Sequence, residues 1–286
     1  MERLIQEQKL VLPGHRSCPG CAGPILQRIV FNVLGKNVIQ YGRGGCGTPS
    51  VLGYPMIYTT HSSAGSDGAA GILAALRAKG IEDVYVVGLA GDGAAADTGF
   101  GKISACAQRN EDMFLFVYDN EAFMNTGVQQ SRLTPFMAWT RTTPGGKKQE
   151  KKDIGMIIAQ HHVPYVSSLS ISHIPDLTRK VRKGMKIKGF KFYHSLNPCP
   201  TGWNYPSSNT VEMARLAVQT WYWPLYEIEN GVFRLTVKSD KKPIDAYFEK
   251  QRRYSHLTEK QIEEIQGIID RKRERMLEMD GKSVWF

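Results

Sequence analysis

An aspartate and an asparagine are spaced in this sequence so that they could bind one divalent metal ion. Asp92 follows an apolar run at 84–89, and Asn120 follows a second apolar run at 113–118. Both runs are typical of buried strands, and residues 99–109 between them are helix-like, which makes a βαβ unit. The carboxyl ends of parallel strands meet at one edge of a sheet, where ligands bind. The pair therefore predicts oxygen ligands for Mg²⁺, with water and diphosphate oxygens as the remaining ligands.

The residues on either side of Asp92 favour a phosphate-containing ligand. Gly91 and Gly93 have no side chain, so the backbone can approach phosphate oxygens closely. A Gly-Asp-Gly sequence alone also occurs in ordinary turns. The asparagine at the end of the next strand is what favours a diphosphate cofactor.

Four of the five cysteines are candidate thiolate ligands. Cys18 and Cys21 form a C-x2-C pair in a glycine-containing turn, and Cys46 and Cys199 follow as single residues. Four thiolates suit a [4Fe-4S] cluster or structural zinc, although a zinc ribbon normally has a second C-x2-C pair. A thioredoxin-like use of the pair, or four unrelated buried thiols, are alternatives that spacing leaves open. Cys106 lies in the helix-like stretch and is expected to pack in the core.

The ordered motifs of the chain together resemble the β subunit of 2-oxoacid:ferredoxin oxidoreductases, and pyruvate:ferredoxin oxidoreductase in particular. The match covers about residues 14–250. Besides the C-x2-C pair, the matching motifs are Gly45-Cys46, Gly91-Asp92-Gly93, Asp97-Thr98-Gly99, Tyr118-Asp119-Asn120-Glu121, Asn125-Thr126-Gly127, Thr140-Arg141-Thr142-Thr143-Pro144-Gly145-Gly146-Lys147 and Pro198-Cys199-Pro200-Thr201-Gly202-Trp203.

The resemblance implies three bound groups: thiamine diphosphate (TPP), Mg²⁺ and one [4Fe-4S] cluster. The metal would be bound by Asp92, Asn120 and the backbone carbonyl of Ala122, and Asn125 would lie beside the reacting thiazolium. The cluster ligands would be Cys18, Cys21, Cys46 and Cys199, and further cofactor contacts would come from Gly45, Gly91, Gly93, Ala94, Ala95 and Thr126. For Asn125 and Thr126 a helix cap is the alternative.

The resemblance also implies a reaction and partner chains. The reaction is the oxidative decarboxylation of a 2-oxoacid, with pyruvate the first choice, to an acyl-CoA and CO2. Coenzyme A is the cosubstrate, and electrons pass through the cluster to external ferredoxin. The chain holds no second copy of its domain to bind the aminopyrimidine ring, so an α-type subunit must supply one. Subunits of the γ and δ (ferredoxin-like) types, or fused equivalents, complete the hetero-oligomer, and the chain alone should be inactive.

Two departures from the family pattern leave the substrate open. Gly23 stands where many relatives have a carboxylate, and residues 60–68 differ from the pyruvate enzymes. Branched-chain, aryl and dicarboxylic acids, including 2-oxoglutarate and oxalate, therefore remain alternatives. His61 is a candidate acid/base or a structural residue. A non-redox TPP decarboxylase and a cofactor-free Fe-S or zinc subunit are the alternatives from other classes.

Composition favours one α/β unit without a membrane segment. The chain has 286 residues, of which 42% are hydrophobic, and a formal net charge of +10. It has no apolar run of the length needed to cross a bilayer and no secretory start, so a soluble cytoplasmic chain is expected. The basic runs at 147–152 and 179–191 lack the interleaved aromatic residues of a nucleic-acid module, which argues against nucleic acid. They could steer ferredoxin, contact partner subunits or be solvated surface.

Helical and strand patterns alternate as in a doubly wound, mostly parallel sheet of the TPP-binding type. We expect helices at 22–34, 63–78, 99–109, 154–160, 174–183, 210–221 and 258–278, and strands at 37–40, 84–89, 113–118, 163–168 and 189–194. A hairpin at 226–237 and a capping box of Thr258 with Gln261 are also expected. Residues 1–242 should form the cofactor-binding domain, and 243–286 a helical arm for subunit contact.

Overall fold

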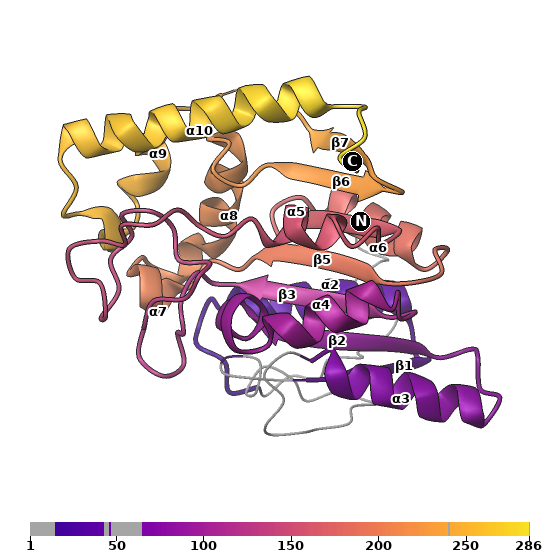
Figure 1. Ribbon diagram of the computed structural model, residues 1–286. Coiled ribbons are helices and arrows are strands. Elements are labelled where there is room, and N and C mark those ends of the chain that lie inside the picture. Colours follow the sequence, from indigo (N-terminus) through magenta and orange to yellow (C-terminus); the bar gives the residue numbers. More distant parts are fainter. Residues whose placement is uncertain (1–14, 43–45, 47–64, 240, 286) are drawn as a thin grey trace.

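The computed structural model describes residues 15–42, 46, 65–239 and 241–285. Gly45 and His61 therefore lie outside the described residues. Seven strands form one sheet at the centre of the molecule (Figure 1). They are β1 (Val38–Tyr41), β2 (Tyr85–Gly91), β3 (Phe114–Asp119), β4 (Tyr165–Ser170), β5 (Lys191–Leu196), β6 (Leu225–Glu229) and β7 (Val232–Val237).

The strand order in the sheet is β1-β2-β3-β5-β4-β6-β7. The first five strands along the chain pair in parallel, whereas β6 pairs antiparallel with β4 and β7 pairs antiparallel with β6. The last two form the expected hairpin, which turns at Asn230 and Gly231 with φ of 48° and 79°. The prediction of a doubly wound, mostly parallel sheet with a C-terminal hairpin is confirmed.

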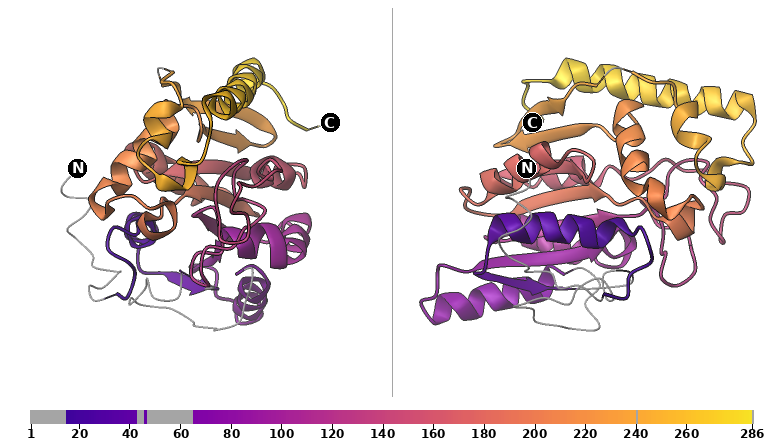
Figure 2. Two further views of the ribbon diagram at one scale, coloured as in Figure 1. Left: turned by 90° about the vertical axis from the view of Figure 1, so that its left-hand side faces the viewer. Right: turned by 180° about the vertical axis from the view of Figure 1, so that it is seen from behind.

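Helices cover both faces of the sheet, as the two views of Figure 2 show. On one face α2 (Ala22–Leu34) packs beside α6 (Ile174–Gly184). The other face carries α3 (Asp67–Ala78), α4 (Phe100–Gln108) and α5 (Ile154–Ala159). Helices α3, α4, α5 and α6 each connect one parallel strand to the next along the chain, which is why helix patterns alternate with strand patterns in the sequence.

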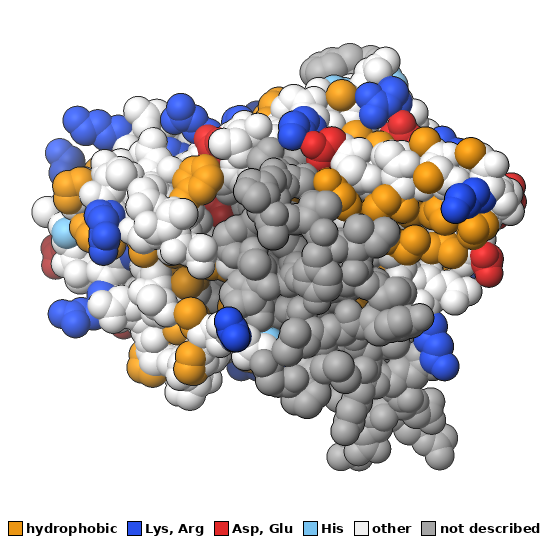
Figure 3. Space-filling view, turned by 90° about the horizontal axis from the view of Figure 1, so that it is seen from below, with side chains coloured by type: hydrophobic (Ala, Val, Ile, Leu, Met, Phe, Trp, Pro, Cys, Tyr) orange, Lys and Arg blue, Asp and Glu red, His pale blue; other side chains and the backbone are white. Residues whose placement is uncertain are grey.

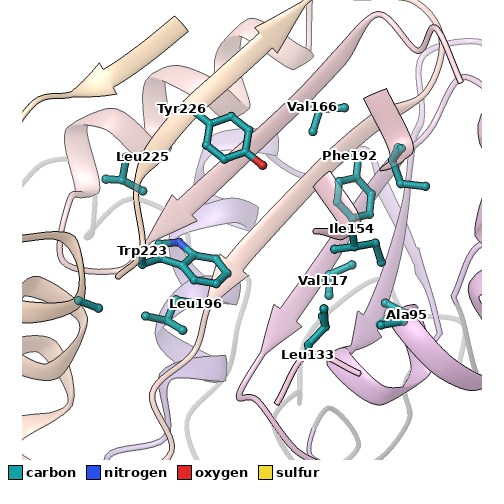
Figure 4. Packing of buried hydrophobic residues seen from close by; sticks show 14 of the residues in the cluster. Ala95, Val117, Leu133, Ile154, Val166, Phe192, Leu196, Trp223, Leu225 and Tyr226 are labelled. Carbon is teal, nitrogen blue, oxygen red and sulfur yellow. The ribbon is translucent and has the colours of Figure 1, made fainter. Parts of the chain in front are cut away.

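Alternate residues of each parallel strand supply the two cores. Val87 and Phe116 pack in the cluster under α2 and α6, whereas Val86 and Val117 pack in the cluster under α4 and α5. Successive side chains of a strand point to opposite faces, so strands covered on both sides, such as β2 and β3, are largely apolar. Figure 4 shows Val117, Ile154 and Phe192 gathered on the α5 side.

Two short helical turns follow strand ends and were not expected from the sequence. The π-helix η2 (Ala94–Thr98) lies between β2 and α4, and α7 (Pro200–Trp203) follows β5. Single π-helical turns occur often at functional sites. Both turns lie at the edge of the sheet where the candidate site residues are found. Within residues 65–239 and 241–285, short 3₁₀ segments occur as η3 (Ser207–Asn209) and η4 (Arg252–Tyr254).

The chain ends in three further helices, α8 (Thr210–Gln219), α9 (Asp245–Phe248) and α10 (Glu259–Met279). Thr258 and Gln261 form the expected capping box at the start of α10, which lies along the hairpin side of the sheet (Figure 1). Within the segment that follows residue 242, Ile244, Tyr247 and Ile269 are buried in the same core cluster as the sheet. The C-terminal segment is therefore packed on the sheet over much of its length.

Among the described residues on the side drawn in Figure 3, Lys and Arg side chains are scattered among other types and form no single basic patch. Several cations of the 179–191 run are already paired: Arg179 and Lys183 contact Glu227, and Lys191 contacts Asp112. In the described part of the chain, no helix is both long and apolar enough to span a bilayer.

Candidate cofactor site

Asp92 and Asn120 lie side by side at the carboxyl edge of the sheet. Strand β2 ends at Gly91 and β3 at Asp119, and the two strands pair in parallel with Gly91 opposite Tyr118. Each predicted ligand is therefore the first residue after its strand, and the two strands are neighbours. Only 3% of Asp92 and 7% of Asn120 is exposed, so both polar side chains need partners other than bulk water.

Three polar groups converge at this point at the spacing of metal ligands. One atom of the Asn120 side-chain amide lies 2.9 Å from the carbonyl oxygen of Ala122 and 3.0 Å from Oδ1 of Asp92. With nitrogen in that place, the amide donates to both oxygens. With oxygen there, three oxygens face one another, which a cation would stabilise. Neighbouring ligands of an octahedral Mg²⁺ lie about 2.9 Å apart, because each lies about 2.0–2.1 Å from the ion.

The surroundings of Asp92 on balance oppose its negative charge. Burial, together with the nearby carboxylate of Asp119, raises the pKa of Asp92 well above its usual range. Its Oδ2 accepts a hydrogen bond of 2.5 Å from the Ser131 hydroxyl. A divalent cation at this place would favour the ionised carboxylate. Ser131 was not predicted as a site residue, because nothing in the sequence indicates that it contacts a residue so far along the chain.

The backbone around Asp92 is shaped by close packing. A Cβ at Gly93 would collide with the ring of Phe123, and one at Gly91 would lie 3.2 Å from the Tyr118 hydroxyl. Ala94 and Ala95 open the π-helical turn η2, whose carbonyl at Ala96 accepts from Lys152 Nζ at 2.5 Å. The small residues thus leave space for neighbouring side chains of the protein as well as for a ligand.

Asn125 and Thr126 lie in an exposed turn beyond Ala122. Thr126 donates from Oγ1 to Gln129 Oε1 at 2.5 Å, and Gln129 Nε2 donates to the Thr126 carbonyl at 2.9 Å. The next described helix begins only at Ile154, so the helix-cap alternative for the pair is wrong. Asn125 lines a cavity that Asn120 also lines.

That cavity, of about 120 Å³, brings the four predicted cluster cysteines together. Its walls include the side chains of Cys18, Cys21, Cys46 and Cys199. Cys21 and Cys199 immediately precede α2 and α7, and Cys199 Sγ accepts from the backbone N–H of Gly202 at 3.3 Å. Cys106 is remote from the cavity: it is buried in α4 and donates to the Ser66 carbonyl.

The thiols are close enough to influence one another. Burial and the neighbouring thiols raise the pKa of Cys46 to about 12, and burial raises the pKa of Cys199 to about 11. Positive charge from iron would favour the thiolates, which are the ligating form. Among the described residues, however, no three Cys, His, Asp or Glu side chains are near enough to one another to bind one metal ion. The four thiols thus share a cavity without forming a tight cluster.

A long irregular segment, residues 120–153, holds the strand ends together. Lys147 lies almost fully buried and donates to the carbonyl of Thr134 at 2.6 Å. Arg132 pairs with Asp97 of η2 at 3.5 Å, and Lys152 bonds to Ala96 in the same turn. Much of the 147–152 run therefore faces the protein, so the interpretation of this run as a surface patch is wrong for those lysines.

Behind the turn at residues 120–122 lies a buried ionic cluster that the sequence did not predict. Lys151 Nζ lies 2.6 Å from Asp119 Oδ2 and 2.8 Å from Glu121 Oε1. His194 Nε2 contacts the same Asp119 oxygen at 2.8 Å. Although burial opposes it, Lys151 and His194 hold the pKa of Asp119 below its usual value. Buried carboxylates are stable only when paired in this way.

The fold and the site define a domain that binds thiamine pyrophosphate. Residues 47–194 match the family model described as the C-terminal TPP-binding domain of thiamine pyrophosphate enzymes. The chain is 44% identical to the pyruvate synthase subunit PorB of Methanocaldococcus jannaschii, over 91% of this chain and 94% of that protein. It is 38% identical to the ketoisovalerate oxidoreductase subunit VorB of Pyrococcus abyssi, over 94% and 95%.

More particularly, the chain belongs to the 2-oxoacid:ferredoxin oxidoreductase family as a β-type, TPP-binding subunit, as its motifs predicted. A solved 2-oxoglutarate:ferredoxin oxidoreductase from Magnetococcus marinus has the same fold. Its chain aligns with a TM-score of 0.59 and 22% identity, over 72% of this chain and 79% of that one.

Proposed function

We propose that this chain is the TPP-binding subunit of an enzyme that oxidatively decarboxylates pyruvate to acetyl-CoA and CO2 and passes the electrons through a [4Fe-4S] cluster to ferredoxin. The observation that carries the proposal is the convergence of Asp92, Asn120 and the Ala122 carbonyl beside a cavity walled by four cysteines. Asn120 lines that cavity as well, so one residue would border both cofactors.

The residues present suit each proposed group. With the amide oxygen of Asn120 turned to the Ala122 carbonyl and Asp92, three oxygens at 2.9–3.0 Å would suit Mg²⁺, which in turn would hold a diphosphate. Four thiols around one cavity suit an iron-sulfur cluster, which needs four thiolates. Bound TPP supplies a carbanion that attacks the carbonyl of a 2-oxoacid. The chain would orient the cofactor through the metal ligands, with Asn125 as the residue nearest the reaction and Ser131 holding Asp92 in place.

The relatives support pyruvate, and a branched-chain 2-oxoacid is the second candidate. The greater identity is to proteins named pyruvate synthase subunit, but those named ketoisovalerate oxidoreductase subunit also align over almost their whole length. All of these relatives are named as subunits, so we propose that an α-type chain with the pyrimidine-binding domain, with γ- and δ-type chains, completes a cytoplasmic enzyme that is inactive without them.

The deciding experiment uses the complex purified without oxygen, with and without its ferredoxin-like subunit. We expect a 2-oxoacid to bleach the visible absorbance of the cluster in both preparations, whereas reduction of external ferredoxin needs the ferredoxin-like subunit. Pyruvate, 2-oxoisovalerate, an aryl 2-oxoacid, 2-oxoglutarate and oxalate are compared, each with coenzyme A.

Two matched variants test the cysteine assignment in the same assay. Cys199→Ser should lose iron and the bleaching, while Cys106→Ser should keep both, because only Cys199 lines the shared cavity. CO2 release without bleaching would favour a non-redox TPP decarboxylase. No reaction with any of the acids, with TPP and iron both verified by analysis, would contradict the proposed function.

A further inference from the structure

Glu121 separates two of the residues proposed to bind the metal, and its backbone adopts an unusual conformation. Its φ is 70°, in the left-handed region that residues other than glycine seldom adopt. Such a conformation persists only when the surrounding contacts hold it. The turn from Asn120 to Ala122 therefore depends on whatever holds Glu121.

The Glu121 carboxylate is fully buried and has three partners. Lys151 Nζ lies 2.8 Å from Oε1, and the Tyr222 hydroxyl donates to Oε1 at 3.0 Å. Arg253 Nη2 lies 2.7 Å from Oε2 as an ion pair. Arg253 comes from the C-terminal segment, far along the chain from the turn that it contacts. Its own side chain is 3% exposed, so it is not a surface charge that happens to lie nearby.

Arg253 also contacts the side chain that holds the other end of the turn. Its guanidinium lies over the ring of Trp203, 3.8 Å from the ring centre. The Trp203 Nε1–H donates to the backbone carbonyl of Asn120 at 2.9 Å. Arg253 therefore acts on two consecutive residues: it contacts Glu121 directly, and it contacts Asn120 through Trp203.

We propose that Arg253 is a positioning residue for the metal-binding turn, so that the segment after residue 242 sets the affinity of the site for Mg²⁺ and TPP. The inference rests on the proposed function and adds a residue to it. Without Arg253, the Glu121 carboxylate keeps Lys151 and Tyr222 but loses one charged partner, and the Trp203 ring loses the group packed on it. Asn120 and the Ala122 carbonyl would then spend less time at the spacing that binds the metal.

The test compares Arg253→Gln with Arg252→Gln in the anaerobically purified complex. Arg252 is the adjacent residue of the same type and is exposed, which makes it a matched control. TPP affinity is measured by calorimetry at several Mg²⁺ concentrations, together with iron content and the melting temperature. We expect Arg253→Gln to bind TPP about 10-fold or more weakly at low Mg²⁺, which is the usual cost of losing a residue that orients a metal ligand. Raising Mg²⁺ should recover part of the loss.

Two further variants separate positioning from a general loss of packing. Arg253→Lys keeps a cation for Glu121 but not the flat group over Trp203, so it should recover part of the TPP affinity. Trp203→Phe keeps a ring for Arg253 but removes the N–H that bonds to Asn120, so it should weaken TPP binding while iron content stays unchanged. These two variants decide the question if Arg253→Gln does not fold.

Equal TPP affinity in Arg253→Gln and Arg252→Gln, at every Mg²⁺ concentration and with both folded, would overturn the inference. So would a melting temperature that falls in Arg253→Gln while TPP affinity does not. Failure of the proposed function looks different, because the unaltered complex and Arg252→Gln would then bind TPP but show no bleaching of the cluster with any of the 2-oxoacids.

Discussion

At the scale of single residues, the site holds a buried carboxyl group whose negative charge its surroundings oppose. Asp92 accepts a hydrogen bond from Ser131 and lies near a second carboxylate, and its pKa is raised by burial first and by Asp119 second. A carboxyl whose pKa is raised on folding contributes stability at low pH that is lost as the pH rises through the raised value. Without metal, the ionised form of Asp92 therefore costs stability.

Asp92→Asn is expected to maintain or raise the melting temperature of the metal-free protein while it weakens the binding of Mg²⁺ and TPP. At pH 7.5 without metal, the variant should melt at least as high as the unaltered protein, and about 2–4 °C higher if about 1 kcal/mol of the burial cost is relieved. Adding Mg²⁺ and TPP at about 100 times the dissociation constant should stabilise the unaltered protein by about 2.7 kcal/mol and the variant hardly at all. Scanning calorimetry checks both, with the exposed Asp83→Asn as control. An equal gain in both proteins would exclude Asp92 as a metal ligand.

Lys147 is a second buried charge with an unusual environment. Its ammonium group bonds to backbone carbonyls, those of Arg132 and Thr134 among them. No carboxylate is within ion-pair distance in the described residues. Burial lowers the pKa of Lys147 to about 8. Between that value and the unfolded value of about 10.4, only the unfolded chain binds the proton, so stability rises with pH in this window and is level below it.

Lys147→Met should flatten that part of the pH profile. The unaltered protein should gain about 1–2 kcal/mol in free energy of unfolding from this residue between pH 7.5 and pH 9.5, and the variant should lack the gain. Its stability at pH 7.5 should also be lower, because carbonyls lose their donor. Urea unfolding at the two pH values measures the difference. Lys148→Met, at the exposed neighbour, should keep the slope, and a slope kept in Lys147→Met as well would refute the assignment.

At the scale of elements, helices and strands whose pattern is local were well predicted. The start of α10 is an example, because Thr258 and Gln261 cap each other through atoms three residues apart. The Asn230-Gly231 turn is another, since positive φ at two consecutive residues is what Asn-Gly favours. The short turns η2 and α7 were missed because they are too short to show periodicity.

Thr258→Ala should destabilise the protein through α10 alone. Losing the hydroxyl removes the 3.4 Å side-chain bond from the N–H of Gln261, which keeps only the Thr258 carbonyl at 3.0 Å, and the expected cost is about 1 kcal/mol in free energy of unfolding. Thr258→Ser keeps the hydroxyl and should cost little. Urea unfolding of the two variants gives the comparison, and an equal loss in both would mean that the methyl group, and not the cap, carries the effect.

At the scale of the whole molecule, the sequence predicted which residues follow strand ends but not which strands become neighbours. Asp92 and Asn120 were predicted together because consecutive parallel strands usually pair. The partners of Glu121 could not be predicted, since Lys151 is 30 residues away and Tyr222 is 101 residues away. Contacts of that kind depend on tertiary packing and leave no local pattern. The same holds for Ser131 at Asp92, which lies 39 residues along the chain.

The position of β5 in the sheet sets an order of events during synthesis. It lies between β3 and β4, although it is made after both. A growing chain that ends after β4 already carries Asp92 and Asn120 but lacks the strand that belongs beside β3, and with it Cys199 and Trp203. The cavity between the two proposed cofactor sites is complete only when these later residues have been synthesised. Cofactors can therefore bind only to the nearly finished polypeptide. In a nascent chain paused before β5, β3 and β4 each have an unpaired edge, and β5 later pairs with both.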